Sequence, residues 1–214
     1  NVIFLRFKGK KVERGRIFRS FGGESRIFGQ RPVAAASKHG SNQVSPDNKN
    51  RTPVLPLDDQ GRLLAKEILA HSRSGALGTL TEARTPFVSL VGVARGTAGS
   101  FYFLVSRLSL HTQHMLVRPN ISLMLSQGGK GDPLAHPRLS LWGTVEAIGR
   151  ESKKFSPARA AYLLDHPKAQ LYVDFPDFLF FKMVVDGASL NGGFGKAYQF
   201  TSTEFRKLCA DQPD

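Results

Sequence analysis

Short hydrophobic runs, separated by glycine, proline and other turn-forming residues, fill most of residues 76–201. Runs of this kind, rich in β-branched and aromatic residues, predict β-strands. One example is residues 86–94, Pro-Phe-Val-Ser-Leu-Val-Gly-Val-Ala, which a glycine-containing turn separates from the next run. The predicted strands cover residues 76–81, 86–94, 100–105, 121–126, 139–148 and 178–186, with 197–201 as a candidate seventh.

Helical spacing appears in only three short segments. Residues 61–72 carry Leu64 and Ile68 one turn apart, and the other two segments are residues 109–117 and 158–164. Helices this short and this few could not cover both faces of a parallel sheet. The pattern therefore predicts a mainly β fold, a small closed antiparallel barrel with flanking helices, rather than a doubly wound α/β fold.

Charge divides the chain unevenly. The net charge is +13 over 214 residues, but residues 1–50 hold 11 Lys and Arg against 3 Asp and Glu, a net of +8. We therefore expect three parts: a basic, disordered leader at 1–52, the barrel domain at 53–204 and a polar tail at 205–214. The leader could equally be translated sequence upstream of the true start, or a targeting segment of the transit-peptide type.

Composition also excludes several classes of protein. Once the leader is set aside, the rest of the chain is only mildly basic, so nucleic acid is not an expected partner. No apolar run is long enough to span a membrane, and we expect a cytoplasmic protein without a membrane partner. The single cysteine, Cys209, rules out an intramolecular disulfide. His111 and His114 lie three residues apart, but no third ligand accompanies them, so no metal site is predicted.

The strongest chemical signal lies where the strand at 100–105 runs into the helix at 109–117. Hydroxyl and basic side chains alternate there, namely Ser106, Arg107, Ser109, His111 and Thr112. The first N–H groups of a helix lack partners within the helix and attract anions. The corner is therefore a candidate phosphate site, although each hydroxyl could instead satisfy a nearby turn.

Two later motifs connect this pattern to a known family. They are His166-Pro-Lys-Ala, followed by Tyr172 and by Phe175-Pro-Asp-Phe178, and Gly192-Gly-Phe-Gly-Lys-Ala197. With the strand order, they make residues 63–200 resemble the pyridoxamine-phosphate-oxidase-like split-barrel flavoproteins, and within these the HugZ-type haem-utilisation branch. The resemblance implies a six- to seven-stranded antiparallel split barrel of the FMN-binding type. It also implies a homodimer that binds FMN, or haem in some members, in a cleft between subunits.

The resemblance also assigns roles to individual residues. It places Ser89, Ser106, His111 and Thr112 around a flavin phosphate, with Arg107 and Ser109 at the same corner, while Leu104 and Val105 would offer backbone groups to the isoalloxazine ring. The arginine and lysine contacts of the oxidases are largely replaced here by hydroxyls, which argues against a pyridoxamine-phosphate oxidase. The C-terminal extension that carries the haem-ligating histidine in HugZ-type proteins is expected to be absent, because the chain stops at Asp214.

We therefore expect an FMN-dependent oxidoreductase that acts on a small-molecule substrate or electron donor, with the chemistry supplied by the flavin. No arrangement of side chains points to a protein-borne catalytic group. Two alternatives remain: a haem-binding or haem-utilisation protein on the same scaffold, and a non-catalytic dimeric regulator. The strand at 178–186 carries aromatic groups on both faces, which supports a homodimer, since a lone barrel buries only one face.

Overall fold

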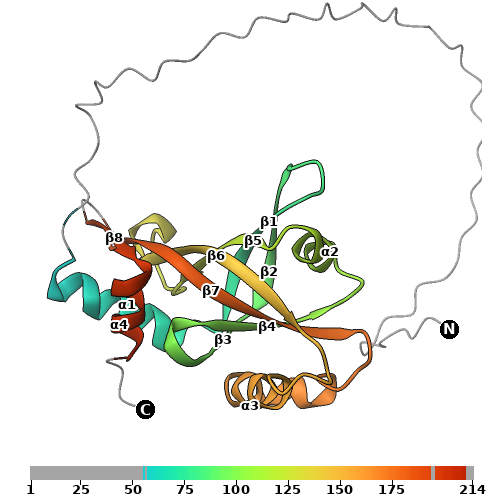
Figure 1. The fold of residues 1–214 in the computed structure, drawn as a ribbon. Helices are drawn as coiled ribbons and strands as arrows, with labels where there is room; N and C mark the ends of the chain where they lie inside the picture. The colour runs from blue at the N-terminus through green and yellow to red at the C-terminus, as the bar shows by residue number, and fades with distance from the viewer. Residues whose placement is uncertain (1–54, 56, 194–195, 211–214) are drawn as a thin grey trace, which may run out of the picture. The chain divides into compact units, whose positions relative to one another are not determined.

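The computed structural model describes residues 55, 57–193 and 196–210, and these form one curled antiparallel sheet with flanking helices (Figure 1). The predicted leader lies outside the described residues. The strands are β1 (Ser74–Leu80), β2 (Pro86–Gly92), β3 (Ala94–Arg95), β4 (Phe101–Ser106), β5 (Asn120–Ser126), β6 (Arg138–Ile148), β7 (Phe178–Asn191) and β8 (Ala197–Thr201). The α-helices are α1 (Asp59–His71), α2 (Leu110–Val117), α3 (Phe155–Asp165) and α4 (Ser202–Ala210), and the 3-10 helices are η1 (Thr97–Gly99), η2 (Pro133–Ala135) and η3 (Pro167–Leu171).

The strand order confirms the predicted fold class, a mainly β barrel with flanking helices. The sheet runs β2-β1-β5-β6-β7-β4-β3, and β8 pairs with β7. There are eight strands within the described residues rather than six or seven. The additional one is β3, which the sequence pattern merged with β2 because Val93 continues the apolar run. Strand β7 continues to Asn191, past Gly187, where a glycine suggested the end of the strand.

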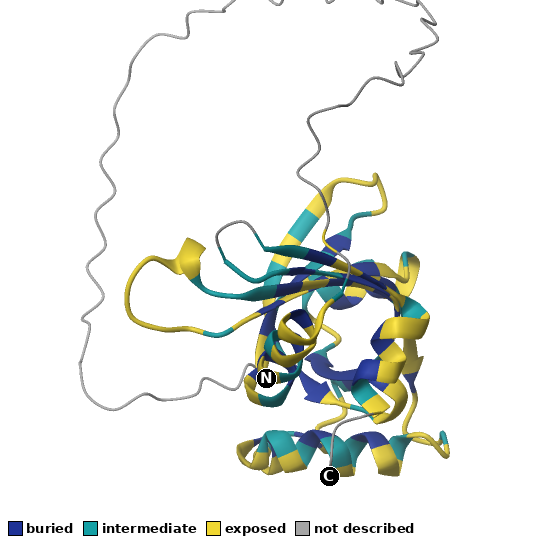
Figure 2. Cartoon of the chain, turned by 90° about the vertical axis from the view of Figure 1, so that its left-hand side faces the viewer, coloured by how far each residue is buried: buried dark blue, intermediate teal, exposed yellow. Residues whose placement is uncertain are grey.

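Strand β4 is buried along almost its whole length because it lies between two hydrophobic clusters. Residues Phe101, Phe103 and Val105 of β4 belong to the hydrophobic cluster inside the curled sheet. The alternate residues Tyr102 and Leu104 belong to a second cluster, which α3 and η3 cover from outside. Both faces of β4 are therefore apolar, and side chains alternate between two cores rather than between core and solvent. Figure 2 shows buried positions gathered on the strands and exposed positions along the outer sides of the helices.

The predicted polar tail is partly wrong. Residues 202–210 form α4, in which Phe205 and Leu208 are almost completely buried and belong to the main core cluster. Cys209 packs against the same cluster, and burial raises the pKa of its thiol to about 11. Phe205, Leu208 and Cys209 follow helical spacing, but the segment is only nine residues long and otherwise polar, and the prediction therefore took it for a tail. Residues 211–214 lie outside the described part of the chain.

Candidate functional site

The sheet is open between β2 and the second half of β4. Strand β2 ends the sheet on one side, and on the other side β3 pairs with β4 only at Phe101 and Tyr102. The edge of β4 from Phe103 to Ser106 has no strand partner opposite β7 among the described residues. Unpaired strand edges offer N–H and C=O groups to a ligand. We call this opening between residues 86–92 and 103–106 the split, and it contains the two predicted backbone contributors, Leu104 and Val105.

Helix α2 covers one end of the split and joins its two sides. It begins three residues after β4, and the Nδ1 atom of His111 lies 3.1 Å from Oγ of Ser89 on β2. The neighbouring turn repeats the arrangement, because Nδ1 of His114 lies 3.0 Å from Oγ1 of Thr79 on β1. The structure therefore brings together Ser89 and His111, two of the residues that were expected around a flavin phosphate.

The surroundings of His111 disfavour its cationic form. Burial, followed by the positive charge that His114 can carry, lowers the pKa of His111 from its ordinary value of 6.5. The neutral imidazole is thus favoured. Its Nε2 atom is buried and has no hydrogen-bond partner within the described part of the chain. A buried polar atom without a partner is unusual and indicates either a cost to stability or a role in binding.

The hydroxyls of Ser106 and Thr112 are bonded within the protein. Ser106 Oγ donates a hydrogen bond of 3.0 Å to the Asp177 carboxylate and accepts one from the Leu108 N–H. Thr112 is fully buried, and its hydroxyl donates to the Ser106 carbonyl at 2.7 Å. These two side chains fix the turn from β4 into α2. Asp177, which sequence reasoning missed, places a negative charge where the phosphate was expected.

Ser109 and Arg107 remain available to an anion at this corner. Ser109 occupies the N-cap position of α2, but its side chain makes no capping hydrogen bond. The N–H groups of Leu110 and His111 have no acceptor among the described residues, while the Ser109 carbonyl accepts from Thr112 and Gln113. The side chain of Arg107 is exposed. The eight predicted residues therefore do not form a single cluster. They fall into pairs that differ in their hydrogen-bond partners and in their structural roles.

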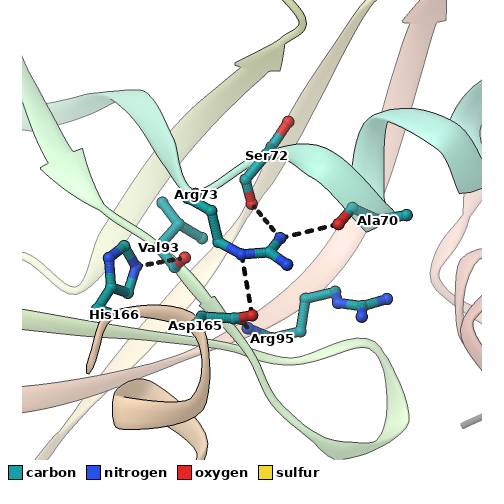
Figure 3. Close-up of polar contacts among 7 residues, drawn as sticks. All are labelled: Ala70, Ser72, Arg73, Val93, Arg95, Asp165 and His166. Atoms are coloured by element: carbon teal, nitrogen blue, oxygen red, sulfur yellow. Dashed lines mark hydrogen bonds and ion pairs between the residues drawn. The ribbon is translucent and has the colours of Figure 1, made fainter.

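The remaining chemical groups lie elsewhere. His166 Nε2 lies 3.0 Å from the Val93 carbonyl oxygen (Figure 3), and the ring stacks on Tyr162, so that His166 holds the end of α3 against the sheet.

In the described part of the chain, no three His, Cys, Asp or Glu side chains gather as a metal site. No described helix is long and apolar enough to cross a membrane. Two surface cavities, of about 490 and 650 Å³, are lined by none of the eight predicted residues.

Comparisons with known proteins agree with this architecture. Non-canonical heme oxygenase HOZ, a chloroplastic protein of Arabidopsis thaliana, is 30% identical in an alignment 208 residues long that covers 90% of this chain and 63% of that protein. A heme binding protein from Mycobacterium smegmatis is 27% identical, with a TM-score of 0.64 over 71% of this chain and 62% of that one. This chain therefore spans less than two thirds of the length of either relative.

A more distant structure shows the shared fold alone. It is a pyridoxinephosphate oxidase family protein from Clostridium acetobutylicum, related to general stress protein 26, at 17% identity and a TM-score of 0.53 over 70% of this chain and 99% of that one. The family model described as CREG, beta-barrel matches residues 56–207, most of the chain and nearly all of its described part. The protein therefore belongs to the CREG β-barrel family, with the split-barrel fold of the pyridoxamine-phosphate-oxidase-like proteins.

Proposed function

We propose that this protein binds haem at the split between β2 and β4. The observation that carries the proposal is the hydrogen bond between Ser106 and the Asp177 carboxylate. A second anion next to Asp177 would be repelled, and this disfavours the flavin phosphate that the sequence predicted at Ser106. Haem has its carboxylates at one edge and presents a broad apolar macrocycle, so it does not need a phosphate seat at this corner.

Exposed apolar side chains lie on both elements that the Ser89–His111 contact joins. Leu110 precedes His111 on α2 and is 61% exposed. Val88 and Leu90 of β2 are 68% and 76% exposed, and alternation along the strand places them on the face opposite to Ser89. Exposed apolar residues that cluster on one face usually mark a binding surface.

His111 is the residue that we propose as the iron ligand. Iron takes the neutral imidazole, which is the form that burial of His111 favours. Its Nε2 is buried and has no partner among the described residues. Ligation requires the ring to turn, which breaks the contact between Nδ1 and Ser89. The two relatives that are named for heme, at 30% and 27% identity, support the choice of ligand.

Haem titration followed by absorption spectroscopy tests this assignment. We expect the full chain to give a Soret band that saturates near one haem per chain. His111→Ala should shift that band and lower the affinity by about tenfold or more, as expected for a lost axial ligand. His71→Ala, which removes an exposed histidine on α1, should bind haem like the unchanged protein. Equal spectra for the two variants would refute His111 as the ligand.

The activity of the bound haem is a further part of the proposal. Haem supplies redox chemistry with dioxygen when a reductant is present, and the protein binds and orients it. The Arabidopsis relative is named as a heme oxygenase. We propose haem degradation here too, and expect the Soret band to disappear when ascorbate is added in air. If the band persists, the protein binds haem but does not degrade it.

FMN is the second candidate because one observation favours it. The Ser109 hydroxyl and the N–H groups of Leu110 and His111 form an anion-binding helix start whose donors are not used within the described residues. If the purified protein shows flavin bands, or if FMN binds more tightly than haem and Ser109→Ala weakens it, flavin replaces haem in the proposal. Absence of both ligands would favour the non-catalytic regulator.

We further propose a homodimer and a plastid location. The exposed apolar residues on the outer face of the sheet, Val88 and Leu90 among them, would be covered by a second copy of the chain. Residues 1–50 are basic and poor in acidic residues, which is typical of transit peptides, and the Arabidopsis relative is named as chloroplastic. A fluorescent protein fused after residue 214 should enter plastids. Fluorescence in the cytoplasm would instead support the location expected from composition.

A further inference from the structure

Residues 175–178, Phe-Pro-Asp-Phe, form a tightly held turn that leads into β7. The Phe178 N–H donates to the Phe175 carbonyl at 3.1 Å, and Arg150 donates to the same carbonyl. The centroid of the Phe178 ring lies 5.2 Å from that of Tyr172 and 6.4 Å from that of Phe175. Backbone bonds and ring packing together therefore determine the position of the third residue of the turn, Asp177.

Asp177 is bonded at two points to the corner between β4 and α2. Its carbonyl accepts from the Arg107 N–H at 2.7 Å, and its carboxylate accepts from the Ser106 hydroxyl at 3.0 Å. The same hydroxyl accepts from the Leu108 N–H at 3.2 Å. The carboxylate is thus held one hydroxyl group away from the turn that leads into α2.

The charge of this carboxylate is not neutralised by an ion pair. In the part of the chain that the structure describes, no lysine, arginine or histidine side chain forms an ion pair with Asp177. A phosphate monoester carries close to two negative charges at neutral pH. The carboxylate therefore repels a phosphate group strongly and a neutral group hardly at all.

This repulsion opposes the anion-binding donors at the start of α2. The Ser109 hydroxyl and the N–H groups of Leu110 and His111 are unused within the described residues and would attract a phosphate. Asp177 is bonded to Ser106, only three residues before Ser109, so its charge acts on the same part of a ligand. Whether a ligand is accepted here thus depends on the charge that it brings to this corner.

We propose that Asp177 is a specificity-determining residue, which excludes from the split those ligands that place a phosphate at the start of α2. The inference rests on the proposed choice of haem over FMN and extends it from one ligand to a class. The turn at 175–178 would carry out this selection by position and charge. Asp177 would contribute no step to the chemistry of the bound ligand.

FMN and riboflavin are suitable probes, because they share the isoalloxazine ring and differ in the phosphate. Flavin fluorescence during titration of the full chain measures both affinities. We expect the unchanged chain to bind FMN no more tightly than riboflavin. Asp177→Asn keeps an oxygen that can accept from Ser106 but removes the charge, so FMN should gain at least about tenfold in affinity while riboflavin gains nothing.

Glu151→Gln is the matched control. It removes one negative charge at an exposed residue before α3 and should leave both flavin affinities unchanged. Asp177→Ser removes the charge in a second way and should raise the affinity for FMN as Asp177→Asn does. Melting curves show which variants fold, and either folded variant of Asp177 decides.

Haem titration of the unchanged chain separates this inference from the proposed function. If haem does not bind, the proposed function fails, while the ratio of FMN to riboflavin affinity still tests Asp177. The inference is overturned if that ratio is the same in Asp177→Asn and Glu151→Gln, or if both flavins gain equally. It is also overturned if no variant binds either flavin.

Discussion

Oγ of Ser89 lies 3.1 Å from Nδ1 of His111, and this contact joins the edge strand β2 to helix α2 across one end of the split. The pair is half-buried, and the second ring nitrogen of His111 has no partner among the described residues. The Ser89 hydroxyl is thus the one hydrogen-bonding group that the structure shows on this imidazole. It sets the orientation of the ring and contributes to the closure of the barrel at this end.

Removal of the Ser89 hydroxyl should destabilise the protein even without a ligand. Ser89→Ala removes the partner of Nδ1 on a half-buried imidazole whose Nε2 already has none, which should lower the unfolding free energy by about 1 kcal/mol. Urea unfolding of the haem-free chain measures this loss. Ser156→Ala, at an exposed serine on α3, controls for the substitution itself and should change stability by less than about 0.5 kcal/mol. Equal midpoints for the two variants would show that the contact is not stabilising.

Gly143 should be among the least replaceable residues of the sheet. It lies at the irregularity between Trp142 and Gly143 in the β6–β7 pairing, and a Cβ there would overlap the backbone carbonyl of Val184. Because a backbone atom cannot move aside as a side chain can, Gly143→Ala should cost about 1–3 kcal/mol or more. Thermal melting should show a lower midpoint for this variant only. The control is Gly149→Ala, where a Cβ would meet nothing within 4 Å.

Helix α4 should prove to be part of the folded domain. Phe205 is fully buried in the main core cluster, so Phe205→Ala should lower the unfolding free energy by about 3–5 kcal/mol. The exposed neighbour Arg206 offers the comparison, and Arg206→Ala should change stability by less than about 0.5 kcal/mol. A polar tail, as the sequence suggested, would tolerate both changes equally.

The contrast between α4 and the strands shows what sequence patterning can recover. The long apolar runs of β4 and β7 are visible because each residue adds to a pattern, and the fold class follows from their number and spacing. Helix α4 is short, and the helical spacing of Phe205, Leu208 and Cys209 is a signal that the sequence-based prediction did not use. The Ser89–His111 pair followed from family resemblance, whereas the Ser106–Asp177 bond joins residues 71 positions apart and becomes visible only in the folded chain.

The outer face of the sheet should form the contact between two copies of the chain. The exposed apolar residues of this face lie on β2, β5, β6 and β7, and β1 lies between β2 and β5 in the sheet. They are Val88, Leu90, Met124, Trp142 and Val184. The Trp142 ring lies where a Cβ at Gly187 would stand, so the face is flat there and suits a second flat surface. Apolar area of this kind is usually covered in the native assembly.

The double variant Leu90→Asp with Trp142→Glu should therefore be monomeric at micromolar concentration, while the unchanged chain is dimeric. Light scattering measures both masses. The control is Leu63→Asp, which places a charge on an equally exposed leucine of α1 and should leave the dimer intact. Haem affinity should fall about tenfold or more in the double variant, because the cleft loses the half that the second copy contributes. An unchanged chain that is monomeric yet binds haem fully would refute the shared cleft.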